Sequence, residues 1–115
     1  MEVNRVVILK EVTEELRFIP AREQIAIQTA IEKLQIFGAS LGHPHSSQVK
    51  GTGIRELRPR AGRSPWRVFY QQRGDRIFLI GAVGPEALQN PRGFRRAVAV
   101  AIDRIDRWED EHEPG

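Results

Sequence analysis

Residues 54–70 read IRELRPRAGRSPWRVFY, two short apolar-alternating segments joined by a Gly/Ser/Pro loop. Side chains in a strand alternate between the two faces of the sheet. With Leu57 and Val68 turned toward a core, Glu56, Arg58 and Arg67 can all lie on an open face of the strand pair. Such a charged face is either a solvated surface, where cross-strand Glu–Arg pairs contribute about 0.2–1 kcal/mol each, or a surface that binds an anion.

The surrounding segments predict the element order β-α-α-β-β-β-α. Residues 3–9 are apolar and β-branched and predict a first strand. Helical spacing of apolar residues predicts helices over 12–19 and 21–37 and a last helix from Pro91 to Trp108, capped by Asn90. Strands are expected over 53–59, 65–72 and 76–83, with Gly74-Asp75 as a turn and 38–53 as a loop. Short links between strands indicate an α+β domain, an antiparallel-rich sheet with its helices on one face.

Composition bounds the class of protein. The chain has 115 residues, which suits one domain over 1–108, and the acidic residues 109–115 are expected to be disordered. Cysteine is absent, which excludes disulfides, thiol chemistry and thiolate metal sites. No apolar run approaches the roughly 20 residues of a membrane span, and no secretory signal is recognised. A cytoplasmic protein without membrane contact is the expectation.

Charge is unevenly distributed along the chain. Residues 50–107 carry thirteen Lys/Arg against five Asp/Glu, and 15 of the 18 basic residues are arginine. Arginine suits bidentate phosphate contacts, although a GC-rich genome would also favour it over lysine. Four basic residues near the strand pair or at the start of the last helix are candidate RNA contacts: Lys50, Arg60, Arg63 and Arg96. His43 and His45 in a Gly/Pro loop are only a weak metal signal, so neither a metal nor a cofactor is predicted.

Several motifs together resemble the RelE/ParE toxin superfamily, in particular its HigB-like, phage-derived branch. They are Glu56-Leu57-Arg58, then Trp66-Arg67-Val68-Phe69-Tyr70, then IFLIGAV and NPRGFRRAVAVAIDRI, in the order and spacing of that family. The similarity spans about residues 5–107. It implies a RelE-like fold with a curved sheet, and a type II toxin neutralised by a small antitoxin, usually a helix-turn-helix protein.

The resemblance also implies an activity, that of a ribosome-dependent mRNA endoribonuclease. In this reaction the RNA 2′-hydroxyl attacks the adjacent phosphate without a metal, and basic side chains stabilise the transition state. Carried over to this sequence, Arg67 would stabilise the phosphate and Arg58 would bind or orient it. Glu56 would accept the 2′-hydroxyl proton or orient the arginines.

Two departures keep other functions open. Gly84-Pro85-Glu86 stands where RelE-like and HigB-like toxins carry a basic pair, and no C-terminal tyrosine follows. A negative charge at Glu86 would repel a nearby phosphate. The alternatives are a gyrase poison of the ParE type, a degenerate member that binds only its antitoxin or RNA, and a phage-derived RNA-binding module.

Overall fold

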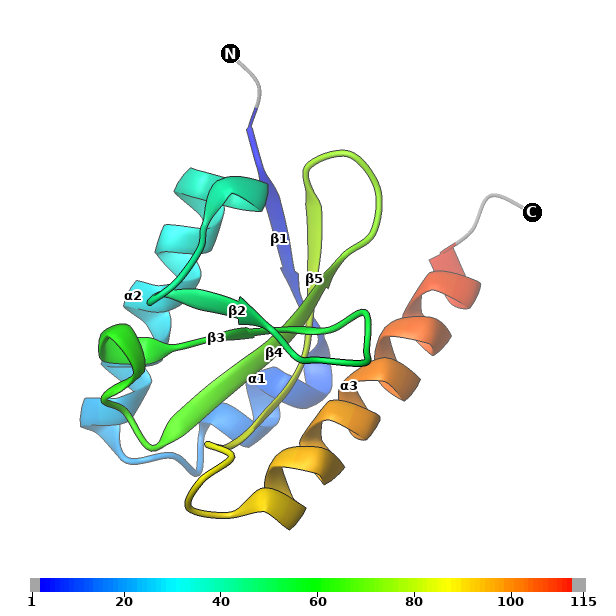
Figure 1. Cartoon of the computed structure of the whole chain (residues 1–115). Coiled ribbons are helices and arrows are strands. Elements are labelled where there is room, and N and C mark those ends of the chain that lie inside the picture. The colour runs from blue at the N-terminus through cyan, green and yellow to red at the C-terminus, as the bar shows by residue number, and fades with distance from the viewer. Residues whose placement is uncertain (1–2, 113–115) are drawn as a thin grey trace.

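The computed structural model describes residues 3–112, which form a five-stranded sheet with three α-helices (Figure 1). The strands are β1 (Arg5–Ile8), β2 (Ser46–Gln48), β3 (Arg55–Leu57), β4 (Trp66–Gln72) and β5 (Ile77–Pro85). The helices are α1 (Lys10–Leu16), α2 (Ala21–Phe37) and α3 (Pro91–His112), with short 3-10 turns η1 (Gly38–Ser40) and η2 (Pro59–Gly62). None of the helices in this part of the chain is long and apolar enough to span a bilayer.

The strand order in the sheet is β1-β5-β4-β3-β2. β1 pairs in parallel with β5, and all other pairs are antiparallel, so the predicted antiparallel-rich α+β sheet is confirmed. β2 is an addition, because it lies within residues 38–53, which were predicted to be loop. Its residues Ser46, Ser47 and Gln48 have no apolar alternation, so only pairing with β3 makes them a strand.

The helix boundaries follow local signals. Asn90 caps α3 as predicted, its Oδ1 accepting a hydrogen bond from the amide of Gly93 at 2.8 Å, with Pro91 as the first helical residue. α2 ends at Gly38, whose φ of 54° is the left-handed region that favours glycine. α1 begins at Lys10, two residues earlier than predicted, because the carbonyl of Leu9 accepts hydrogen bonds from the amides of Val12 and Thr13.

The prediction that all helices lie on one face of the sheet is wrong. Figure 1 shows α1 and α2 behind the sheet and α3 to the right of it. The Phe94 ring on α3 meets Phe69 edge-on, with centroids 5.2 Å apart, and Phe69 shares a face with Glu56 in register. Leu57 and Val68 point the other way and are fully buried. Both faces of the sheet therefore bury apolar side chains. The alternation of side chains along a strand does not by itself show whether one face or both are buried.

Close approach of α3 to the sheet requires Gly84. A Cβ on Gly84 would lie 2.6 Å from the Ala97 side chain and 3.3 Å from the Phe69 ring. Gly84 of β5 is in register with Arg67 of β4. The contact between Gly84 and Ala97 therefore sets how near the start of α3 comes to the charged strand pair.

α3 is longer than the sequence predicted and continues through His112. Glu109, assigned to a disordered tail, is helical and forms an ion pair with Arg73, which also reaches Asp106 at 2.6 Å. Near the middle of α3, Arg104 makes a two-point contact with Glu15 on α1 at 2.9 Å. Of these pairs, Arg73–Glu109 is the one that lies beyond Trp108, the end of the apolar stripe, and it stabilises the added turn. The last three residues of the predicted tail, 113–115, lie outside the described residues.

Candidate functional site

Three side chains from neighbouring parts of the sheet converge on one carboxylate oxygen, Oε1 of Glu56. Arg58 Nη1 donates to it at 2.9 Å, Ser47 Oγ at 3.3 Å, and Arg67 Nε lies 3.6 Å away. Ser47 and Glu56 are directly opposed in register between β2 and β3, which places the serine within reach. We call Ser47, Glu56, Arg58 and Arg67 the Glu56 cluster. The structure brings Glu56, Arg58 and Arg67 together, as strand alternation predicted, while Ser47 was missed because β2 was.

The face that carries the cluster is not open, contrary to expectation. Arg67 is 4% exposed and Glu56 is 8% exposed. The η2 loop lies against this end of the sheet, where Arg67 donates to the carbonyls of Gly62 and Ser64. Further along the same face, Phe94 of α3 packs on Phe69. Arg58 is the most accessible charged member of the cluster, with 23% of its side chain exposed.

Arg67 is largely occupied by the backbone around it. Its Nη1 donates to the carbonyls of Ser64 at 2.8 Å and Trp66 at 2.9 Å, and its Nη2 donates to that of Gly62 at 3.3 Å. Burial lowers the pKa of its guanidinium, the charge of Arg58 lowers it further, and Glu56 opposes both. Arg67 therefore fixes the loop over the cluster and has little donor capacity left for a ligand.

The loop that Arg67 holds has an unusual backbone. Arg60 and Ala61 adopt positive φ angles of 55° and 54°, and Gly62 one of 93°. Non-glycine residues in this region cost of order 1 kcal/mol or more and persist only where surrounding contacts enforce them. A Cβ on Gly62 would lie 2.5 Å from Arg58 Nη2, so glycine is needed where the loop passes the cluster.

Contacts to α2 enforce that loop conformation. Glu23 accepts from Arg60 Nη1 at 2.8 Å and from the hydroxyl of Ser64 at 2.7 Å. These hydrogen bonds, that of Arg60 first, lower the pKa of Glu23, and burial opposes the shift. Sequence spacing gave no signal for Glu23 or Ser64, which lie 41 residues apart and meet only when η2 packs on α2.

Arg58 and Glu56 retain groups that could meet a ligand. Arg58 is oriented by Nε donating to the carbonyl of Pro44 at 3.1 Å and by Nη1 donating to Glu56. The contacts of the Glu56 carboxylate all use Oε1, so within residues 3–112 Oε2 has no hydrogen-bond partner. An oriented arginine can bind an oxyanion, and the free oxygen of the carboxylate beside it can accept a proton from a neighbouring hydroxyl.

Comparison with known proteins gives the family. A model of the family described as phage derived protein Gp49-like matches residues 14–83, more than half of the chain. The chain belongs to this family. The search of curated proteins gives no match.

The solved structures that resemble this Gp49-like chain include the following two. The first is the toxin RelE of Escherichia coli in the free state, as a mutant with two arginines replaced by alanine. It superposes with a TM-score of 0.63 at 12% identity, covering 90% of this chain and 99% of RelE. A chain of the archaeal RelE–RelB complex from Pyrococcus horikoshii gives a TM-score of 0.56 at 23% identity, covering 73% of this chain and 96% of that one. At these identities the likeness establishes the fold, which is that of RelE, as the resemblance implied.

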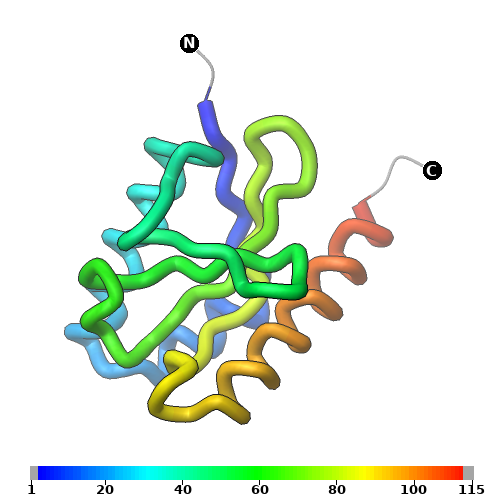
Figure 2. Tube along the Cα trace, in the orientation of Figure 1, coloured from blue at the N-terminus to red at the C-terminus, as the bar shows by residue number. Residues whose placement is uncertain are grey.

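The four predicted RNA contacts of the Gp49-like chain are scattered. Arg60 turns away from the cluster to Glu23 and the carbonyl of Arg22, and exposed Arg63 donates to the carbonyl of Arg60 at 3.1 Å. Lys50 lies in the loop between β2 and β3, which approaches α3 (Figure 2). Arg96 lines a separate depression beside α3. Only Arg60 and Arg63 lie on the loop that covers the Glu56 cluster.

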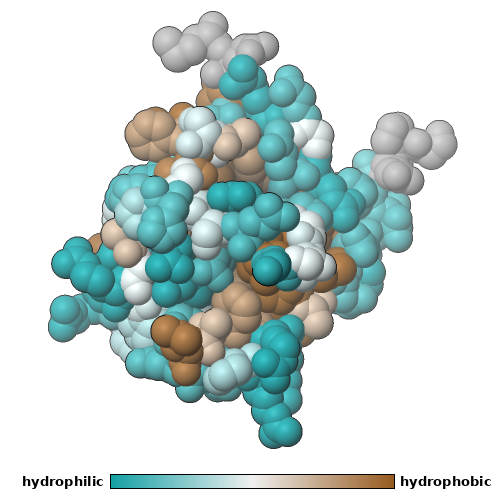
Figure 3. Space-filling model, viewed as in Figure 1, coloured by the Kyte–Doolittle hydropathy of each residue, from teal (hydrophilic) through white to brown (hydrophobic). Residues whose placement is uncertain are grey.

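An apolar groove runs between that β2–β3 loop and α3, visible as a brown band in Figure 3. It has a volume of about 330 Å³, and its lining residues include Val49, Phe94, Val98, Ile102, Lys50 and Arg95. Arg95, rather than the predicted Arg96, thus lies on the Lys50 side of α3. Helical periodicity distinguishes the two only once the apolar face of α3 is fixed.

Glu86 follows β5 as the sequence suggested, but its carboxylate is engaged. It accepts hydrogen bonds from the amides of Leu88 at 3.1 Å and Gln89 at 2.6 Å, and so stabilises the turn that leads into α3. Its charge is still close enough to oppose, in small part, the lowering of the Arg67 pKa that burial causes. Among residues 3–112, no three histidine, aspartate or glutamate side chains are grouped to hold a metal ion.

Proposed function

We propose that this chain is the toxin of a type II toxin–antitoxin system and cleaves mRNA on the ribosome. The support is membership of the phage-derived Gp49-like family, a fold shared with a protein named toxin RelE, and the motifs that resemble the HigB-like branch. The single observation that carries the catalytic part is the Glu56 cluster, in which a partly exposed arginine lies beside a carboxylate oxygen without a partner among residues 3–112.

In the proposed reaction Glu56 Oε2 accepts the proton of an RNA 2′-hydroxyl. The resulting oxygen attacks the adjacent phosphorus, the bond to the 5′-oxygen breaks, and that oxygen takes a proton from solvent. Arg58 donates to the phosphate oxygens as negative charge develops on them, the kind of electrostatic stabilisation that contributes most to such reactions. Arg67 acts as a positioning residue, because its donors are held by carbonyl groups. This reverses the roles of the two arginines expected from the family resemblance.

The proposal includes partners and a cellular location. The Pyrococcus structure is that of a RelE–RelB complex, which supports an antitoxin partner for this chain. We propose a small helix-turn-helix antitoxin, as in the HigB-like branch, and mRNA in the ribosomal A site as the substrate, which places the protein in the cytoplasm. Lys50, Arg60 and Arg63 would add attraction to the RNA backbone, and Arg96 a further contact beyond the groove.

Expression of the chain alone, under tight induction, tests the proposal. Growth arrest with cleaved transcripts is expected for the wild type. Glu56→Gln and Arg58→Ala are each expected to lower the cleavage rate by about 10²–10³-fold, the usual effect of losing one group that stabilises a transition state. Arg107→Ala is the matched control, because Arg107 is exposed near the far end of α3, where it pairs with Asp103. Normal growth with intact transcripts for the wild type would remove the endoribonuclease.

One observation favours a second candidate, a RelE-fold toxin that does not cut RNA. Pro85 and Glu86 occupy the positions of a basic pair, and Arg67 is occupied by the backbone, so the cationic groups near the cluster are few. A gyrase supercoiling assay separates this candidate from the first. Inhibition of supercoiling without transcript cleavage would support a gyrase poison, and no inhibition at micromolar protein would remove that alternative.

A further inference from the structure

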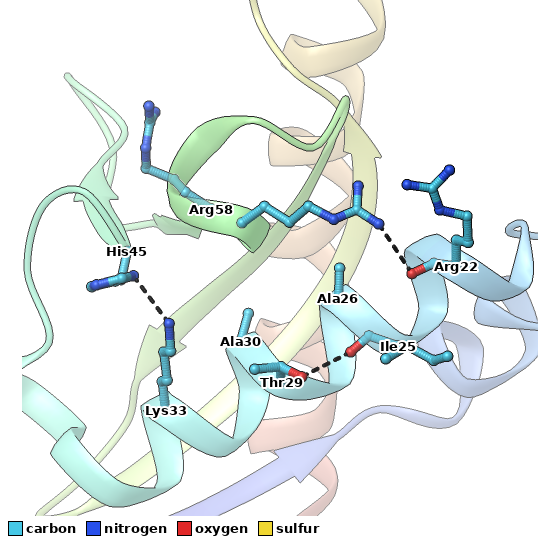
Figure 4. Close-up of a pocket in the computed structure, with 9 residues that line it drawn as sticks. Arg22, Ile25, Ala26, Thr29, Ala30, Lys33, His45 and Arg58 are labelled. Carbon is cyan, nitrogen blue, oxygen red and sulfur yellow. Dashed lines mark hydrogen bonds between the residues drawn. The ribbon is translucent and has the colours of Figure 1, made fainter.

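A cleft on the outer side of α2 gathers positive charge, most of it from residues outside the Glu56 cluster. It has a volume of about 270 Å³ and lies between α2, His45 and the η2 loop (Figure 4). Four cationic side chains line it: Arg22, Lys33, Arg58 and Arg60. We call it the α2 cleft. Arg58 belongs to both sites, so the cleft adjoins the cluster.

Only two of these four cations are matched by a carboxylate in the described part of the chain. Arg60 pairs with Glu23 and Arg58 pairs with Glu56. Within residues 3–112 neither Arg22 nor Lys33 has a carboxylate at ion-pair distance, and Lys33 Nζ lies 3.5 Å from His45 Nδ1. Because neither charge is compensated by a carboxylate there, an anionic partner could pair with both.

The floor of the cleft is apolar and built from small side chains. Ala26 and Ala30 leave room at its centre, and Ile25 stands at its rim with 69% of its surface exposed. Ile36 is 70% exposed and lies eleven residues further on, which brings it back to the same side of the helix, about 16 Å along its axis. On this side of α2, Arg22 and Lys33 flank the two isoleucines, and the exposed Glu32 lies between them. Exposed apolar residues in line with charged neighbours are typical of a surface that receives an amphipathic helix.

We propose that the α2 cleft and the exposed Ile25–Ile36 side of α2 form a docking surface for an acidic amphipathic helix of a protein partner. The partner's apolar face would cover Ile25 and Ile36, and its carboxylates would pair with Arg22 and Lys33. RNA is the less suitable occupant, because single-stranded RNA sites use aromatic platforms and the cleft is lined by no phenylalanine, tyrosine or tryptophan of the described chain. The proposal deepens the antitoxin part of the proposed function and rests on it, since an antitoxin would supply such a helix, but it does not depend on RNA cleavage.

An NMR titration of the full chain tests the surface. The probe is a helical peptide of about 18 residues, five turns, with leucine on one face and glutamate on the other. A control peptide has lysine in place of glutamate. We expect the acidic peptide to shift the backbone amides of residues 22–36, and the basic peptide to leave them unchanged. Arg22→Glu with Lys33→Glu should weaken binding by about tenfold or more, because both pairs become repulsive.

Two further variants separate the apolar and ionic contributions. Ile25→Ser with Ile36→Ser should weaken binding with all charges intact, while Arg107→Glu on α3 should leave it unchanged. Amides of α2 that do not shift at millimolar acidic peptide would overturn the proposal. An oligouridine of about 20 residues that shifts them instead, in a manner abolished by Arg22→Glu with Lys33→Glu, would also overturn it and make the cleft an RNA site. Neither result changes the outcome of the transcript-cleavage test. Failure of the docking surface can therefore be distinguished from failure of the proposed endoribonuclease.

Discussion

Replacement of Arg67 by alanine should destabilise the protein far more than replacement of any other arginine in the stretch 54–70. The change removes hydrogen bonds to the carbonyls of Gly62, Ser64 and Trp66 and takes one cation from Glu56. A hydrogen bond to a charged group contributes about 1.5–3 kcal/mol, and removal of one partner from a buried ion pair costs about 3–5 kcal/mol. Because these contributions overlap, we expect a loss of about 4 kcal/mol.

Urea unfolding, followed by tryptophan fluorescence, measures this loss. If the free energy of unfolding falls by about 1.5 kcal/mol per M of urea, the midpoint of the urea transition should fall by roughly 2.5 M. Arg63→Ala is the matched control, because exposed Arg63 donates to the carbonyl of Arg60, and its effect should stay within about 0.5 kcal/mol. Arg67→Lys keeps the charge but cannot reach all three carbonyls. Its loss of stability should lie between those of Arg67→Ala and Arg63→Ala.

A loss below about 1 kcal/mol for Arg67→Ala would refute this reasoning. It would mean that the guanidinium does not hold the η2 loop, and Arg67 would then be available to bind phosphate as the family resemblance implies. A large loss has the opposite consequence. An inactive Arg67→Ala variant would then say nothing about catalysis, and Arg58→Ala, at a partly exposed side chain, becomes the informative substitution.

Two further predictions concern the packing around the site. Gly84→Ala places a Cβ 2.6 Å from the Ala97 side chain and should lower the free energy of unfolding by about 1–3 kcal/mol in the same urea assay. Gly42→Ala is the control and should be near neutral, because a Cβ there would have nothing within 4 Å. Equal effects of the two changes would contradict the close packing of α3. Glu23 has a lowered pKa because Arg60 and Ser64 donate to it, so its stabilisation is present above the ordinary glutamate pKa of 4.5 and is lost as the pH falls through the lower folded-state pKa. The wild type should therefore be more stable than Glu23→Gln between about pH 5 and 8, with the difference shrinking below about pH 4.5, and a difference that does not change with pH would contradict the role of Glu23.

Much of the fold followed from sequence because local signals agreed with one another. The Asn90-Pro91 cap, the Gly74-Asp75 turn and the alternation in residues 66–70 each correspond to an observed element. β2 could not be predicted, because Ser46-Ser47-Gln48 becomes a strand only through its pairing with β3. The position of α3 on the opposite face was also hidden, since the sequence does not show which buried face of the sheet a helix covers.

Three of the four members of the Glu56 cluster were predictable from the sequence, but their burial was not. Strand alternation places Glu56, Arg58 and Arg67 together, whereas the burial of Arg67 depends on carbonyl groups of a loop with positive φ angles. Glu23, which holds that loop on α2 through Ser64, is distant from it in sequence. The extension of α3 depends on ion pairs from Arg73 to its last turns, so composition alone suggested a disordered tail.

The most direct measurement of the central claim is RNA cleavage by the purified chain on ribosomes programmed with a defined mRNA. We predict a cut in the A-site codon that leaves a 2′,3′-cyclic phosphate, with the rate reduced about 10²–10³-fold in Glu56→Gln and Arg58→Ala and unchanged in Arg107→Ala. Intact mRNA with the wild-type chain, or equal cleavage by Glu56→Gln and the wild type, would contradict it.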